Sequence, residues 1–201
     1  MMGIDRRQLL SLEAYAKSRT EFRAKVLAHK RPRTVRLGDH LRLQFEDEFT
    51  MRYQVQEMLR IEKIFEEEGI AEELSVYGAL VPDGGNFKAS LLLEYEVVAA
   101  RREALRRLRG IEDRVWVCAA GGERVYAVAD EDLPRETEEK TSAVHFLRFE
   151  LDAATRGRLL GGAALAVGVD HPHYQVSLDP VPEETRRALV ADLHGLREPP
   201  G

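Results

Sequence analysis

The sequence is poor in cysteine, in lysine and in long apolar runs, and these shortages exclude several classes of protein. The one cysteine among 201 residues, Cys118, cannot form an internal disulfide or a structural zinc cluster, which fits a reducing compartment. No window approaches the ~18 uninterrupted apolar residues of a membrane span, and the first residues contain no apolar signal-peptide core. We therefore expect a cytoplasmic protein with no membrane partner.

The charge balance argues against a nucleic-acid binder. The chain has 30 basic and 35 acidic residues and a net charge of −5, whereas nucleic-acid binders are strongly basic. The basic residues are 24 Arg and only 6 Lys, which fits a GC-rich genome. Arginine also binds carboxylates and phosphates in a bidentate manner, which lysine cannot do. We expect no nucleic-acid partner.

The common catalytic signatures are absent as well. The chain contains no glycine-rich phosphate loop, no H-E-x-x-H zinc motif, no C-x-x-C pair and no G-x-S-x-G nucleophile turn. Cys118 has no cationic neighbour in the sequence, so a small buried structural residue is expected there rather than a reactive thiol. A function must therefore be sought in scattered polar side chains.

The first third of the chain predicts helices around a short hairpin. Asp5 is expected to cap one helix through Tyr15, and Thr20 to begin a second through Leu27. A hairpin follows over residues 34–45, with Gly38 in its turn. The longest helix is predicted over 48–68, with Asp47 as its cap and Gly69 as its stop. Its apolar set is wider than one stripe, so we expect neighbours on two sides.

The remaining segments predict mostly strands. Alternation and turn residues indicate strands over 88–95, 114–119, 124–128, 143–151, 163–169 and 174–178, and helices over 71–80, 98–108, 153–160 and 182–193. This order predicts a single α+β domain over residues 1–196, with a mainly antiparallel sheet packed against several helices, one of them long and central. Residues 197–201 are expected to form a disordered tail.

Four groups of polar residues are candidates for a site. One is Ala28-His29-Lys30-Arg31 at a helix end, where the cations either complement the helix dipole or bind an anion. On the long helix, Tyr53, Glu57 and Arg60 share one face, and Glu57 and Arg60 either form an ion pair or contact a ligand. In strand 143–151, His145 lies on the apolar face, either as a satisfied core residue or as an acid, base or ligand. Arg148 leaves the opposite face.

The fourth group is Asp170-His171-Pro172-His173, just past a predicted strand. An aspartate beside a histidine suits metal binding, because ligating imidazoles often donate to a carboxylate; a proline turn with exposed polar residues is the alternative. Histidine and carboxylate ligands without cysteine suit Zn, Fe or Mn.

Several strings taken together resemble the bacterial family DUF3501, over roughly residues 9–193. They are Val26-Leu-Ala-His-Lys-Arg31, Phe45-Glu46, Tyr53-Gln-Val-Gln-Glu-Met-Leu-Arg60, Val81-Pro-Asp-Gly84, Leu108-Arg-Gly-Ile-Glu112, Ala129-Asp-Glu-Asp-Leu133, Lys140-Thr-Ser-Ala-Val-His-Phe-Leu-Arg-Phe-Glu150 and Gly168-Val-Asp-His-Pro172. The chain departs from the family pattern at Gly78 and His173, so His173 is not expected to be an essential ligand. The family has no known activity. Its genes often neighbour those of rubrerythrin-like and iron–sulfur oxidoreductase proteins, which implies a redox or oxidative-stress setting.

From these residues we expect a polar pocket between the long helix, the His145 strand and the Asp170-His171 turn. It would bind a small anionic or redox-linked ligand, with Fe, Mn or Zn as candidate metals. Glu57 and His145 would transfer protons, and the metal ligands would be His145, His171 and Glu57. The ligand would contact Tyr53, Gln56, Arg60, Lys140 and Arg148. The alternative is a non-enzymatic accessory protein that docks onto a rubrerythrin-like or iron–sulfur partner.

Overall fold

The chain opens with one long helix where two were predicted. The computed structural model describes residues 3–132, 135–137 and 139–193. A short turn, η1 (Arg6–Gln8), leads to α1 (Leu12–Lys30), and the Ser11 side chain caps α1 by accepting a hydrogen bond from the Ala14 N–H. The predicted break at Thr20 is wrong, because no glycine or proline interrupts α1 and a capping residue alone does not end a helix.

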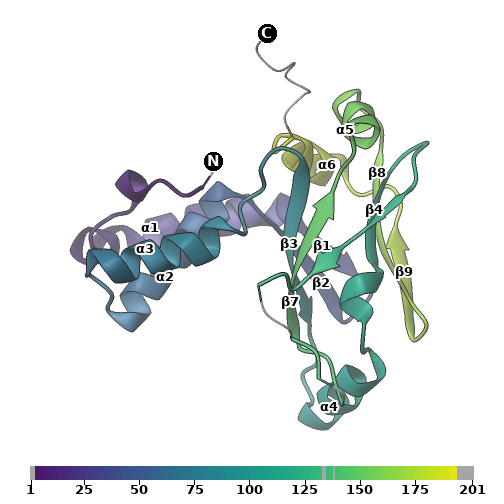
Figure 1. Cartoon of the computed structure of the whole chain (residues 1–201), viewed down its shortest axis with the longest axis horizontal. Helices are drawn as coiled ribbons and strands as arrows, with labels where there is room; N and C mark the ends of the chain where they lie inside the picture. Colours follow the sequence, from purple (N-terminus) through teal and green to yellow (C-terminus); the bar gives the residue numbers. More distant parts are fainter. Residues whose placement is uncertain (1–2, 133–134, 138, 194–201) are drawn as a thin grey trace.

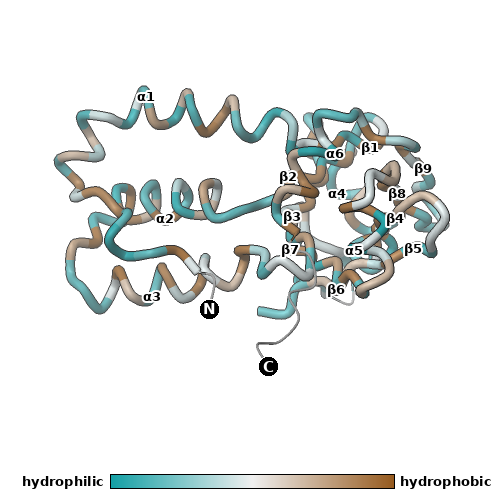
Figure 2. Tube along the Cα trace, turned by 90° about the horizontal axis from the view of Figure 1, so that it is seen from above, coloured by the Kyte–Doolittle hydropathy of each residue, from teal (hydrophilic) through white to brown (hydrophobic). Residues whose placement is uncertain are grey.

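The second long helix, α2 (Glu48–Glu62), begins as predicted and ends early. Asp47 caps it and forms a capping box with Thr50. The helix stops at Lys63, which has a left-handed φ of 56°, and Ile64 then turns back onto the small apolar core between α2 and α3 (Glu67–Gly78). Figure 2 shows α2 between α1 and α3, which confirms that it is covered on two sides.

Two antiparallel sheets follow the helices. Sheet A has the order β1-β2-β3-β7-β6 and sheet B the order β5-β4-β8-β9. Sheet A consists of β1 (Thr34–Leu37), β2 (Leu41–Glu46), β3 (Asn86–Leu93), β6 (Val128–Ala129) and β7 (Val144–Glu150). Sheet B consists of β4 (Val115–Ala119), β5 (Arg124–Tyr126), β8 (Leu165–His171) and β9 (Tyr174–Leu178). Both predicted hairpins are confirmed, but the predicted strand 124–128 is divided, because the chain crosses from sheet B to sheet A at Ala127.

One apolar core fills the space between the two sheets. In β7, Leu147 is 2% exposed and Phe149 0%, whereas the alternate residues of the strand are more exposed, so the predicted alternation is confirmed. The remaining helical elements are η2 (Arg31–Arg33), α4 (Val98–Arg107), η3 (Ile111–Arg114), α5 (Ala153–Leu160) and α6 (Glu183–Val190). In Figure 1, α1, α2 and α3 extend to one side of the sheets.

The α+β class with antiparallel sheets is confirmed for the described residues. The predicted tail 197–201 lies outside them. Within the described ranges, no helix is long and apolar enough to cross a membrane.

Candidate functional site

The alternation of β7 buries His145 on the inner face of sheet A. The side chain is completely buried, and each ring nitrogen has a polar partner. Nδ1 lies 2.6 Å from Oδ2 of Asp130, and Nε2 lies 2.8 Å from the hydroxyl of Thr141 and 3.1 Å from the carbonyl of Ser142. His145 is therefore held in one orientation between a carboxylate and a hydroxyl group.

Asp130 reaches His145 because the chain enters sheet A just before it. It follows β6, has a positive φ of 49°, and accepts the backbone N–H of Phe146 through Oδ1 at 3.0 Å. Arg135 contacts the same oxygen at 3.2 Å. The aspartate is thus anchored from two sides while Oδ2 faces the imidazole.

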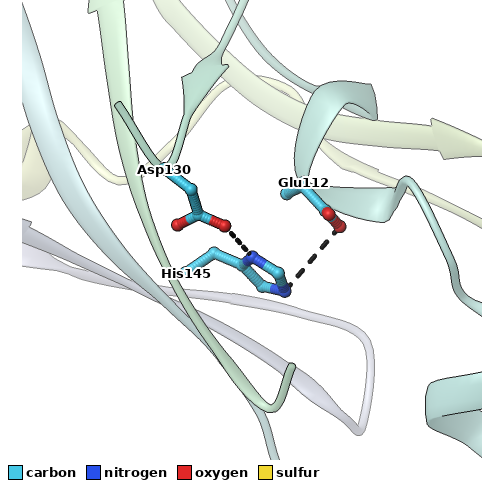
Figure 3. Close-up of side chains that lie close together, drawn as sticks. All are labelled: Glu112, Asp130 and His145. Atoms are coloured by element: carbon cyan, nitrogen blue, oxygen red, sulfur yellow. Dashed lines mark hydrogen bonds and ion pairs between the residues drawn. The ribbon is translucent and has the colours of Figure 1, made fainter. Parts of the chain in front are cut away.

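Glu112 completes the cluster from η3, on the other side of the ring. Its Oε2 accepts the Thr141 hydroxyl at 3.0 Å and lies 3.7 Å from Nε2 of His145 (Figure 3). Burial raises the pKa of the Glu112 carboxyl above its ordinary value, and His145 and Thr141 oppose this effect in part. The side chains of Glu112 and Asp130 are 8% and 9% exposed.

These three residues form a group with the composition of a metal site. One ligand atom from each of Glu112, Asp130 and His145 lies within 4.8 Å of the other two. Among the described residues, no other group of three histidine, cysteine or acidic residues meets this spacing. A nitrogen and carboxylate oxygens suit Fe, Mn or Zn, and the same atoms also form a hydrogen-bonded chain along which a proton could move.

Sequence reasoning found His145 and missed its two acidic neighbours. Glu112 and Asp130 precede His145 by 33 and 15 residues, so no local spacing connects them. Both lie in strings that carry the family resemblance, Leu108–Glu112 and Ala129–Leu133. These strings were the sequence feature that could have pointed to the two acidic residues. Thr141, just before β7, bridges Glu112 and His145.

The predicted residues of the long helix form a separate cluster between α1 and α2. Glu57 accepts hydrogen bonds from Tyr15 at 2.6 Å and from Arg19 at 2.7 and 2.8 Å, and Arg60 lies 3.3 Å away. These donors lower the pKa of Glu57 to about 2, with Arg19 the largest cause. The interpretation of Glu57 and Arg60 as an ion pair therefore holds.

Two other residues of the long helix have packing roles. The buried side-chain amide of Gln56 pairs with both the N–H and the carbonyl of Leu10. The ring of Tyr53 stacks on Phe22 of α1 at 6.1 Å. The structure places neither residue beside His145.

The remaining candidates also lie apart from His145. Arg148, on the outer face of β7, pairs with Glu131 at 2.8 Å and Glu150 at 2.6 Å, and Lys140 is exposed. His171 lies within β8 rather than after it, and its Nε2 lies 2.9 Å from the carbonyl of Arg109. Burial lowers the pKa of His171.

The predicted metal set is therefore corrected, because its members do not come together. His145 faces the core between the sheets, whereas Glu57 lies between two helices on the outer side of sheet A. His171 is bonded to the backbone of another segment. Of the expected ligands His145, His171 and Glu57, only His145 belongs to the group with metal-site spacing among the described residues.

Comparison with known proteins assigns the family. The family model described as "Protein of unknown function (DUF3501)" matches residues 3–193. The chain belongs to DUF3501. The crystal structure of a novel protein of unknown function from Burkholderia pseudomallei K96243 is similar to this chain, with 55% sequence identity and a TM-score of 0.91. The match covers 96% of this DUF3501 chain and 100% of the Burkholderia chain. The search of curated proteins found no match to this DUF3501 chain.

Proposed function

We propose that this DUF3501 protein binds a divalent transition metal, Fe, Mn or Zn, at Glu112 and His145, with Asp130 orienting the imidazole. The observation that carries the proposal is the approach of three ligand-type atoms, from three separate segments, to within 4.8 Å in a buried place. Buried charged groups are costly unless they are paired or coordinate a metal, and this set combines two carboxylates with an imidazole. The residues fit a metal better than an organic ligand, because the cluster is too enclosed for a large molecule.

The contacts assign a role to each residue. Nε2 of His145 and the carboxylate of Glu112 face each other across 3.7 Å and would contact the metal. Asp130 holds Nδ1 of His145 and so orients the ring, which is the usual arrangement of a carboxylate behind a metal-bound histidine. A proton on Nε2 is the competing occupant, and metal binding displaces it. The affinity for metal should therefore rise with pH.

The anionic ligand of the sequence analysis receives less support than the metal. Arg60 and Arg148, which were expected to neutralise an anion, already pair with Glu57 and with Glu131 and Glu150.

Elemental analysis of tag-free protein, purified without air, tests this function. We expect near-stoichiometric Fe, Mn or Zn in the parent and its loss in Glu112→Gln. This change keeps the size of the side chain and removes its charge, so folding should be retained. His173→Ala is the matched control, because His173 is exposed and outside the cluster. Equal metal content in the parent and in Glu112→Gln, or no metal in the parent even after incubation with Fe(II), Mn(II) and Zn(II), would reject the proposal.

Docking onto a rubrerythrin-like or iron–sulfur partner is the second candidate. Ile61 and Phe65 favour it, since they are 57% and 69% exposed near the turn between α2 and α3, far from the sheets (Figure 1). In this case Phe65→Asp should weaken binding to such a partner and leave the metal content unchanged. Glu112→Gln should lower the metal content and leave partner binding unchanged. Unchanged binding of Phe65→Asp would exclude this surface.

A further inference from the structure

A second cavity lies on the outer face of sheet A, away from the metal cluster. Its volume is about 380 Å³, and it lies between β2, β3 and β7 on one side and α1, α2 and the end of α3 on the other. Its polar lining includes Glu46 and Ser90 of the sheet and Lys30 at the end of α1. Ligand sites in proteins are concave and combine apolar side chains with converging polar groups, and this cavity has both.

Glu46 has an unsatisfied oxygen in this cavity. The residue is 4% exposed, and Oε1 accepts the hydroxyl of Ser90 at 2.8 Å. Its Oε2 is buried and has no hydrogen-bond partner among the described residues. Because a buried carboxylate oxygen without a donor is costly, Oε2 of Glu46 is an acceptor available to an N–H or O–H group that enters the cavity.

The surrounding charges favour a cationic donor at this position. Arg33 is a buried cation that interacts electrostatically with Glu46, and it already pairs with Asp47 at 3.1 Å and Asp192 at 2.6 Å. Arg42 also lines the cavity but pairs with Glu94 at 2.6 Å. The charge of Glu46 is therefore not matched by an ion-pair partner in the described part of the chain.

Lys30 supplies a charge of the opposite sign nearby. The hydroxyl of Thr34 bonds to the Lys30 carbonyl at 2.8 Å and to the Gln44 side chain at 2.9 Å, so the end of α1 lies beside Gln44. Gln44 and Glu46 are two residues apart on the same face of β2, or about 7 Å. The ammonium of Lys30 has no ion-pair partner within the described ranges. A carboxylate and an ammonium are thus both available to one small molecule.

We propose that this cavity binds a small zwitterion with an apolar side chain, of the amino-acid class. The ammonium of the ligand donates to Oε2 of Glu46, and its carboxylate pairs with Lys30. The apolar side chain lies against Met51, Leu92 and Phe146, which also line the cavity. This site is on the opposite face of sheet A from His145, so binding in the cavity does not depend on the metal proposed at His145.

Calorimetric titration with three matched probes tests the proposal: L-leucine, 3-methylbutylamine, which lacks the carboxylate, and 4-methylpentanoate, which lacks the amine. We expect leucine to bind the parent about tenfold or more tightly than either analogue, since a charge-assisted hydrogen bond contributes that much. Glu46→Gln should lower the affinity for leucine by a similar factor and leave the affinity for 4-methylpentanoate unchanged. Lys30→Met should lower the affinity for leucine and leave the affinity for 3-methylbutylamine unchanged.

Glu62→Gln is the control, because Glu62 is exposed and does not line the cavity. It should bind all three probes as the parent does. Equal affinity for the three probes would indicate only apolar adsorption and would overturn the proposal. The absence of binding by leucine, or leucine binding unchanged in Glu46→Gln, would also overturn it.

Discussion

Glu57 is the residue whose environment most clearly distinguishes a packing role from a catalytic one. It receives hydrogen bonds from Tyr15, Arg19 and Arg60, and its side chain is 12% exposed. These donors satisfy the charged form and hold the pKa of Glu57 at about 2, well below the ordinary 4.5. A carboxylate in this state is a poor proton carrier near neutral pH, but it joins α1 to α2 strongly.

Glu57→Gln should therefore lower stability in a pH-dependent way. At neutral pH we expect a loss of about 2 kcal/mol in the free energy of unfolding, because the two arginines lose their charged acceptor. A lowered pKa in the folded state contributes stability above the unfolded pKa, and this contribution disappears as the pH falls from about 5 towards 2. Urea denaturation across this range should show the difference between parent and variant shrinking. A difference that stays constant with pH would contradict the argument, and Glu62→Gln serves as the control.

At the scale of elements, one glycine allows β4 and β8 to pair. Gly168 lies opposite Trp116 in the register of sheet B, and the indole ring covers it. A Cβ atom built on Gly168 would lie 2.3 Å from a ring carbon of Trp116. The ring is 5% exposed and also contacts Arg124, whose guanidinium lies 4.2 Å from the ring centroid. The ring therefore has little freedom to move away.

Gly168→Ala should destabilise the protein by about 2 kcal/mol, because overpacking forces the ring or the strand to shift. The measurement is the free energy of unfolding from a urea titration followed by tryptophan fluorescence. Gly78→Ala is the matched control, since nothing lies within 4 Å of its added methyl group and alanine favours the helix α3. If both variants are equally stable, Trp116 does not restrict Gly168.

At the scale of the whole molecule, Arg33 joins segments that are far apart in the chain. It is 4% exposed and binds Asp192 through two nitrogens, at 2.6 and 2.8 Å. It also contacts the carbonyl of Ala188 at 3.0 Å and Asp47, the cap of α2, at 3.1 Å. One side chain thus connects the end of α6 to the beginning of α2.

A double-mutant cycle should measure this connection. Arg33→Gln and Asp192→Asn should each lower the free energy of unfolding by about 3 kcal/mol, because each leaves a buried charge without its partner. The double variant should lose less than the sum of the two, since it leaves neither Arg33 nor Asp192 as a charge without its partner. Arg33→Lys should not restore the parent's stability, because an ammonium cannot bind Asp192 in a bidentate manner. Additive losses would show that the two residues act separately.

The sequence by itself determined the features that depend on a few neighbouring residues. Asp47 caps α2 because its carboxylate needs only the N–H group of Thr50, three residues away. The alternation of β7 follows from the two-residue period of a strand, which placed His145 and Arg148 on opposite faces. The turn of the first hairpin follows from Gly38, whose φ of +68° favours glycine.

The tertiary structure alone decided which of these residues meet. Glu112 and Asp130 lie beside His145 because the chain crosses between the sheets at Ala127 and because η3 packs against β6 and β8. Glu57 meets Arg19, which is 38 residues away, and so belongs to the packing of two helices. Local patterns are set by interactions over one to four residues, whereas these clusters depend on how separate elements bury their apolar faces together. No spacing in the sequence carries that information.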